Sequence, residues 1–143
     1  MKEKFMPAKD FYHDIVRGAL EQEGWIITSD PYYFSVGEVD FFIDLGAEQL
    51  IAAERGVDKI AIEIKGFAES SPVHAFHEAV GKYINYRAAL EENESDRVLY
   101  LAIPKLSYEN FFQRPFVQKM IQLEKIKLIV YEPEKKAIIK WIQ

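Results

Sequence analysis

The stretch KIAIEIKGF, residues 59–67, carries two charged residues whose types and spacing could do chemistry. Glu63 and Lys65 are two positions apart, and residues i and i+2 of a strand point to the same side of a sheet. The isoleucines that alternate with them face the opposite side and are suited to a core. Charges in a central strand need partners, so the charged side is expected to lie in or beside a cleft.

The strand before this one offers a second carboxylate. The Gly56-Val57-Asp58 segment predicts a turn and an antiparallel hairpin, in which the numbers of opposed residues add up to about 111 to 113. Glu48 then lies opposite Glu63 or opposite Lys65. Asp44 is four residues before Glu48, so its side chain faces the same side of the sheet. It lies ~13 Å farther along a straight strand, unless the chain bends at Gly46. Glu48 is therefore the favoured second acid, and Asp44 is the alternative or an outer ligand.

Two or three carboxylates beside a lysine form an oxygen-rich site for a hard cation. Mg²⁺ is typically held by one or two carboxylates, several waters and substrate phosphates, and Mn²⁺ accepts the same oxygen ligands. The predicted metal ligands are Asp44, Glu48 and Glu63. A metal held there would polarise a phosphate and lower the pKa of a water, and Lys65 could stabilise charge on the phosphate.

Length and composition set the class of protein. The chain has 143 residues, which fits one domain spanning 1–143, and apolar residues make up 49% of it. It contains no cysteine, which excludes disulfides, thiolate catalysis and cysteine-ligated metal centres. The net charge of −5 argues against a basic surface that grips nucleic acid unaided. Since no apolar run resembles a signal peptide or a membrane span, a cytoplasmic location is expected.

Hydrophobic periodicity and turn residues predict three helices and a set of strands. The first helix is expected from about Ala8 to Glu23, and Gly24 ends it. A second helix is expected to begin after Ser71 as N-cap, with Pro72 in its first turn, and to reach about Glu92. A third follows Ser107 and is broken or restarted at Pro115. Extended segments are expected at 24–36, broken by a turn at Ser29-Asp30-Pro31, and at 38–44, 48–55, 59–67, 97–104, 126–133 and 136–142.

These elements alternate along the chain. The segment RVLYLAIP, residues 97–104, is almost entirely apolar, as is typical of a strand covered on both faces. The order helix, hairpin strands, helix, strand, helix, strand predicts an α/β fold with a mixed central sheet and helices on its faces.

Several segments together resemble the XisH family, whose members are described as controlling factors for excision of the fdxN DNA element in cyanobacteria. The similarity runs from the first helix to the C-terminal strand. The segments that carry it are DFYHDIVRGALEQEGWIITSDPY, IDLGAEQLIAAERG, IAIEIKGF, AVGKYINYRAAL and RVLYLAIP. This resemblance implies a DNA context for the protein.

The XisH family in turn looks like a branch of the PD-(D/E)xK nuclease superfamily, which implies a restriction-endonuclease-like core. Glu63, Ile64 and Lys65 match the (D/E)-x-K motif, and the acid on the preceding strand falls to Glu48 or Asp44. The resemblance implies a Mg²⁺-dependent or Mn²⁺-dependent endonuclease. It equally allows an accessory protein that keeps the fold without catalysis and binds an XisI-like protein or a recombinase. Either form is compatible with a homo-oligomer.

The resemblance also points to the helix after the lysine strand, where XisH-like sequences place G-Q-x-x-x-Y. Here Lys82 replaces the glutamine and Tyr86 matches the tyrosine, and the two lie four apart on one helix face. An acid from the first helix is common in the superfamily, and Asp14 and Glu21 are both available. The histidines, by contrast, are interpreted as surface or helix-packing residues, including the pair His74 and His77.

Overall fold

The computed structural model describes residues 8–52, 56–68 and 71–143. Its helices and strands follow the order expected from the sequence. They are α1 (Ala8–Gln22), β1 (Ile26–Ser29), β2 (Tyr32–Val36), β3 (Val39–Ile43), β4 (Leu45–Ala52), β5 (Gly56–Ile64), α2 (Pro72–Asn93), β6 (Arg97–Pro104), α3 (Lys105–Glu109), the 3-10 turn η1 (Phe111–Gln113), α4 (Pro115–Leu123), β7 (Leu128–Glu132) and β8 (Ala137–Ile142).

The main sheet has six strands in the order β1-β4-β5-β6-β7-β8. The pairs β5–β6 and β6–β7 are parallel, and the pairs toward both edges are antiparallel. The predicted mixed α/β sheet is confirmed, and β5, which carries Glu63, is one of its two central strands. A connection between parallel strands must cross a face of the sheet, and α2 makes that crossing between β5 and β6.

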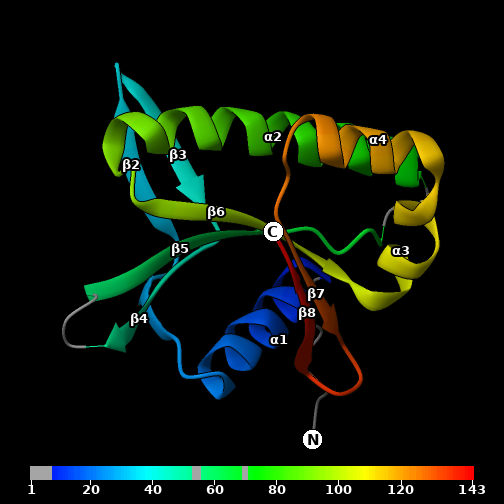
Figure 1. The fold of residues 1–143 in the computed structure, drawn as a ribbon, viewed down its shortest axis with the longest axis horizontal. Coiled ribbons are helices and arrows are strands. Elements are labelled where there is room, and N and C mark those ends of the chain that lie inside the picture. Colours follow the sequence, from blue (N-terminus) through cyan, green and yellow to red (C-terminus); the bar gives the residue numbers. More distant parts are fainter. Residues whose placement is uncertain (1–7, 53–55, 69–70) are drawn as a thin grey trace, which may run out of the picture.

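Helices cover both faces of the sheet, α1 on one face and α2 and α4 on the other (Figure 1), and an apolar layer lies between the helices and each face. On one face α1 buries Val16 and Leu20 against Ile60 and Ile62 of β5. On the other face α2, η1 and α4 pack against β6 and β7 around the fully buried Phe112. Successive side chains of β5 therefore point to opposite faces of the sheet as expected, with the isoleucines toward α1 and Glu63 toward α2.

The hairpin of β2 and β3 forms a separate two-stranded sheet that packs beside α2. Its inner aromatic rings join the core on the α2 side, with Phe34 stacked on Phe41 at a centroid distance of 5.3 Å. By contrast, Tyr33 and Phe42 on the outer side of the hairpin are exposed. A buried arginine, Arg97, lies over the Tyr32 ring and ties this hairpin to the sheet.

The helix boundaries follow local signals that the sequence contains. Gly24 lies just past α1 with φ of +90°, a backbone conformation that glycine adopts without strain. The hydroxyl of Ser71 accepts a hydrogen bond from the N–H of His74 at 3.2 Å and caps α2. The third predicted helix is divided into α3, η1 and α4, with Pro115 at the first position of α4.

The predicted register of the β4–β5 hairpin is wrong. Leu45 lies opposite Ile62 and Glu48 lies opposite Lys59, because the predicted turn residues 56–58 belong to β5 itself. The predicted strand end at Arg55 lies outside the described residues. Glu48 does share the sheet face of Glu63, but it is four residues, or ~13 Å, away along the strands. The expectation that Glu48 faces Glu63 or Lys65 therefore fails.

The bend of the chain lies at Asp44 and not at Gly46. β3 ends at Ile43 and β4 begins at Leu45, so Asp44 is the single residue that joins the small sheet to the large one. The same register that moves Glu48 away brings Asp44 level with Glu63. Among the described residues, no helix is long and apolar enough to cross a membrane.

Candidate functional site

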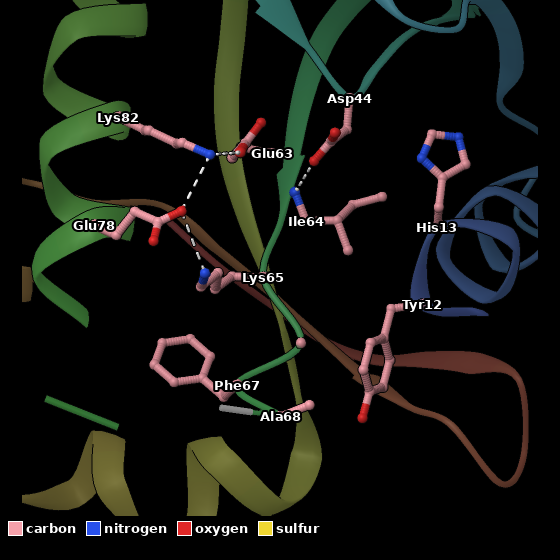
Figure 2. A pocket seen from close by; sticks show the side chains of 11 residues that line it. Tyr12, His13, Asp44, Glu63, Ile64, Lys65, Phe67, Ala68, Glu78 and Lys82 are labelled. Carbon is pink, nitrogen blue, oxygen red and sulfur yellow. Dashed lines mark hydrogen bonds and ion pairs between the residues drawn. The ribbon is translucent and has the colours of Figure 1, made fainter. Parts of the chain in front are cut away.

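A cavity of about 480 Å³ lies at the carboxyl end of β5 (Figure 2). Four parts of the fold contribute to it: α1, the joint between β3 and β4, the segment that follows β5, and α2. The lining residues are Tyr12, His13, Asp44, Glu63, Ile64, Lys65, Gly66, Phe67, Ala68, Glu78 and Lys82. Most of the charged ones face each other across this space in Figure 2.

Asp44 is fixed by the backbone of the neighbouring strand. One carboxylate oxygen, Oδ2, accepts a hydrogen bond from the N–H of Ile64 at 2.8 Å. This bond holds the side chain at the end of β5, where Asp44 lines the cavity. Asp44 is half-buried, so its carboxylate can still be reached by a ligand.

Glu63 is a buried carboxyl in a position that disfavours its charge. Only 6% of the residue is exposed, and its Oε1 has no hydrogen-bond partner among the described residues. Burial, and then the adjacent carboxylate of Asp44, raise the pKa of Glu63 to about 8, against the opposing effect of Lys82. A buried oxygen without a partner is costly, and a cation bound beside Asp44 would remove that cost.

A chain of ion pairs links the cavity wall to α2. Lys82 Nζ lies 3.8 Å from Glu63 Oε2 and 3.3 Å from Glu78 Oε1, and Lys65 Nζ lies 3.4 Å from the same Glu78 oxygen. The hydrogen bond from Lys82 holds the pKa of Glu78 below its usual range. Burial alone would lower the pKa of Lys82, but Glu63 and Glu78 outweigh it and raise that pKa. The two lysines thus both supply positive charge to the same carboxylate oxygen of Glu78.

Tyr86 lies one helical turn beyond Lys82 and is half-buried. Burial, followed by the charges of Glu63 and Asp44, raises the pKa of Tyr86 to about 12, so its hydroxyl stays protonated. Its ring packs edge-on against Phe41 at a centroid distance of 6.2 Å. Tyr86 therefore lies within the field of the carboxylates but does not line the cavity itself.

Four of the residues singled out in the sequence converge on the cavity: Asp44, Glu63, Lys65 and Lys82. Glu48 does not belong to this group, because of the register described above. Neither acid proposed for the first helix lines the cavity.

Asp14 is exposed, and Glu21 pairs with Arg17 at 3.9 Å. In place of an acid, α1 contributes Tyr12 and His13 to the cavity wall.

Sequence reasoning missed Glu78, Gly66 and His13. Glu78 could have been found, since it precedes Lys82 by four positions, the spacing of a helical ion pair. Gly66 is required because a Cβ there would overlap the ring of Tyr12. No local signal distinguishes His13, which acquires its place through contacts with residues distant in the chain.

Asp44 and Glu63 are the side chains that could hold a hard cation. Among residues 8–52, 56–68 and 71–143, no group of three or more histidine and acidic side chains is arranged to bind a metal. Two carboxylates still suffice for Mg²⁺, which normally completes its shell with waters and substrate phosphates. The orphaned Oε1 of Glu63 beside Asp44 fits such a cation. His74 and His77 are exposed on α2 and line no part of the cavity.

Comparisons with known proteins agree with the resemblance read from the sequence. The model of the family described as "XisH protein" matches residues 6–139. The crystal structure of an XisH family protein from Nostoc punctiforme is 42% identical, with a TM-score of 0.86, and covers 94% of this chain and 100% of that one. That of a fdxN element excision controlling factor protein from Anabaena variabilis is 43% identical, with a TM-score of 0.86, and covers 94% and 99%.

None of the curated proteins matches the chain. The family model nevertheless spans nearly the whole sequence, and the fold agrees with two solved members over almost their full length. The chain therefore belongs to the XisH family, which includes the fdxN element excision controlling factor of Anabaena variabilis.

Proposed function

We propose that this protein is a divalent-cation-dependent enzyme that cleaves phosphodiester bonds in DNA, built on a restriction-endonuclease-like PD-(D/E)xK core. The observation that carries the proposal is the buried carboxyl of Glu63, whose Oε1 has no partner among the described residues, beside Asp44 in an open cavity. Lys65, two residues on, supplies an ammonium group at the same cavity. This combination suits a metal and a phosphate better than it suits a closed core.

Asp44 and Glu63 would hold Mg²⁺ or Mn²⁺, with Asp44 in the place that the sequence had assigned to Glu48. A cation bound there supplies charge that polarises a phosphate oxygen and lowers the pKa of a water. Asp44 is kept in orientation by the N–H of Ile64, so its carboxylate is preorganised for the ion. The pKa of Glu63 is raised to about 8, so the carboxyl keeps its proton near neutral pH, and a cation that binds there would displace that proton.

The lysines and the tyrosine have separate roles in this proposal. Lys65 contacts a non-bridging phosphate oxygen and stabilises the charge that develops on it. Lys82 neutralises Glu63 and Glu78 while no cation is bound, and can turn to the phosphate when one is. Tyr86 keeps its proton, since its pKa is about 12, and can donate a hydrogen bond toward the carboxylates.

DNA is the proposed substrate because a relative with 43% identity is a fdxN element excision controlling factor, a role that concerns a DNA element. The net charge of −5 disfavours tight binding of DNA by this chain alone. The proposal therefore includes help from a partner, either an XisI-like protein, a recombinase or a second copy in a homo-oligomer. A cytoplasmic location is part of the same proposal.

The test uses supercoiled plasmid DNA with Mg²⁺ or Mn²⁺. The parent protein should nick the plasmid, and Glu63→Gln and Lys65→Ala should each lower the rate at least about a hundredfold. Glu48→Gln is the matched control, since Glu48 shares the sheet face of Glu63 but lies outside the cavity. Equal nicking by all four proteins would reveal a contaminating nuclease and remove support for the proposal.

A second candidate function is that of an accessory protein without catalysis. It is favoured by the ion-pair chain, in which Lys82 and Lys65 already neutralise Glu63 and Glu78. Calorimetry with Mg²⁺ and Mn²⁺ separates the two candidates. An accessory protein should bind neither cation and should nick no DNA, whereas the enzyme should bind at least one of them, and Glu63→Gln should abolish that binding.

A further inference from the structure

His13 stands on the wall of the cavity that α1 contributes. Figure 2 shows Asp44 between this imidazole on one side and Glu63 and Lys65 on the other. The side chain of His13 is 20% exposed, so the ring is shielded from bulk solvent but open to the cavity. The function proposed above assigns no role to it.

The carboxylate of Asp30 holds the His13 ring on the side of Nε2. Nε2 of His13 lies 2.8 Å from Oδ1 of Asp30, and Oδ2 of Asp30 accepts a hydrogen bond from Arg17. His13 and Arg17 are four apart on α1, so both reach Asp30 from one helix face. The N–H of a neutral imidazole must then lie on Nε2, because only that nitrogen faces an acceptor. Nδ1 makes no hydrogen bond to a described residue and is left for a ligand.

The Asp30 carboxylate behind the ring is held in its ionised form. Burial alone would raise the pKa of Asp30, but the hydrogen bonds from His13 and Arg17 outweigh it and hold that pKa below its usual range. Glu21 also lies 3.9 Å from Arg17, so one arginine is shared by two carboxylates. When the His13 ring carries both protons, Nε2–H is donated to Asp30 and Nδ1–H is available to the cavity.

Glu63 and Lys65 lie on one side of Asp44 and His13 lies on the other (Figure 2), an arrangement that suits the two oxygens of a phosphoryl displacement. The attacking and the leaving oxygen lie on opposite sides of the phosphorus in such a reaction. If the water is positioned beside Glu63 and Lys65, the leaving oxygen points toward the His13 side of Asp44. α1 contributes two titratable side chains to the cavity wall, His13 and Tyr12, and imidazole is the commoner general acid of the two.

We propose that His13, positioned by Asp30, donates the proton to the leaving oxygen of the phosphodiester, a role that rests on the proposed cleavage. The water oxygen forms a bond to phosphorus, and the bond from phosphorus to the leaving oxygen breaks with its electron pair on that oxygen. The Nδ1–H proton of the imidazolium passes to this oxygen and yields a hydroxyl. The attacking water gives its proton to solvent, and the neutral imidazole takes one from solvent before the next turnover.

The experiment compares two substrates that differ in their need for a proton. A DNA strand leaves as an alkoxide that must be protonated, whereas the nitrophenolate of thymidine 5′-(p-nitrophenyl phosphate) is stable without a proton. His13→Gln keeps a donor that can reach Asp30 but cannot act as the acid. It should slow DNA nicking about a hundredfold or more and leave nitrophenolate release within about threefold of the parent.

Three further variants, Asp30→Asn, His74→Ala and His13→Ala, test whether the effect comes from His13 acting as the acid. Asp30→Asn should slow DNA nicking less than His13→Gln does, because Asp30 acts through His13. It should likewise leave the rate of nitrophenolate release nearly unchanged. His74→Ala is the matched control, since His74 is an exposed histidine outside the cavity, and it should behave like the parent. Thermal unfolding of each variant shows whether the fold persists, and added imidazole should partly restore DNA nicking to His13→Ala.

The outcomes separate this proposal from the proposed function. Equal slowing of both substrates by His13→Gln, or no slowing of either, would overturn the role of His13 while cleavage by the parent still stands. A parent that cleaves neither substrate, with Glu63→Gln indistinguishable from it, would overturn both. Nitrogen-15 NMR at alkaline pH gives an independent check, because a neutral His13 that carries its proton on Nδ1 would contradict the proposed orientation.

Discussion

The carboxylate of Asp44 accepts a hydrogen bond from the N–H of Ile64 at 2.8 Å, which ties the joint between β3 and β4 to the end of β5. Ile64 separates Glu63 from Lys65, so this one bond sets the place of Asp44 relative to both. The small aromatic hairpin and the large sheet meet at this residue. The geometry of the candidate site thus depends on how two sheets are joined as well as on one strand.

Asp44 and Glu48 should differ sharply in their effect on cation binding. Asp44→Asn should weaken binding of Mn²⁺ at least about tenfold, because it removes one of two negative ligands. Glu48→Gln should leave the affinity unchanged, since Glu48 lies opposite Lys59 and outside the cavity. Isothermal calorimetry with both variants measures this difference, and an equal loss in both would contradict the register.

The stability of the metal-free protein should fall as pH rises. The pKa of Glu63 is near 4.5 in the unfolded chain and about 8 in the folded one. Between these two values the unfolded state has lost a proton that the folded state retains, so a rising pH favours unfolding. The contribution is fully present below pH 4.5 and is lost once pH passes about 8.

Urea unfolding at a series of pH values measures this effect. Glu63→Gln imitates the protonated carboxyl and should flatten the decline, whereas Glu91→Gln on the exposed side of α2 should not. Saturating Mn²⁺ should also flatten it for the parent, because a bound cation stabilises the ionised form. A decline that is the same in the parent and in Glu63→Gln would show that another group causes it.

Lys82 should compete with a divalent cation for Glu63. Lys82→Gln removes the ammonium 3.8 Å from Glu63 and restores the glutamine that the family resemblance implies at this position. Because the competing pair is partly exposed, its loss should raise the affinity for Mn²⁺ only about fivefold. Lys119→Gln on α4, away from the cavity, is the control, and calorimetry measures both. A lower affinity in Lys82→Gln would mean that Lys82 assists the site in another way.

Gly66 and Gly81 should respond in opposite ways to alanine. A Cβ at Gly66 would overlap the ring of Tyr12 on the cavity wall, so Gly66→Ala should destabilise the protein by roughly 1–3 kcal/mol. Gly81 lies inside α2, and a Cβ added there would meet no heavy atom within 4 Å, so Gly81→Ala should stabilise by roughly 0.5–1 kcal/mol. Thermal unfolding of the two variants checks both signs, and stabilisation by both would mean that Tyr12 can move aside.

Local patterns in the sequence determined much of this protein. The period of two placed Glu63 and Lys65 on one side of a strand and the isoleucines on the other, and β5 has that division. Pro72 and Ser71 marked the start of α2, and Gly24 marked the end of α1, because each acts through its own backbone conformation or side chain. The spacing of Lys82 and Tyr86 placed them on one face of that helix.

Pairing between segments could not be decided in this way. A turn that lies only a few residues earlier keeps every side chain on the same face but changes its partner. The sequence therefore favoured Glu48 over Asp44, and only the register of β4 on β5 brought Asp44 level with Glu63. The position of His13 was still harder to predict from local patterns. Its place at the cavity depends on Asp30, which lies beyond a helix and a strand and approaches His13 only when α1 packs on the sheet, so the tertiary structure alone could bring the two together.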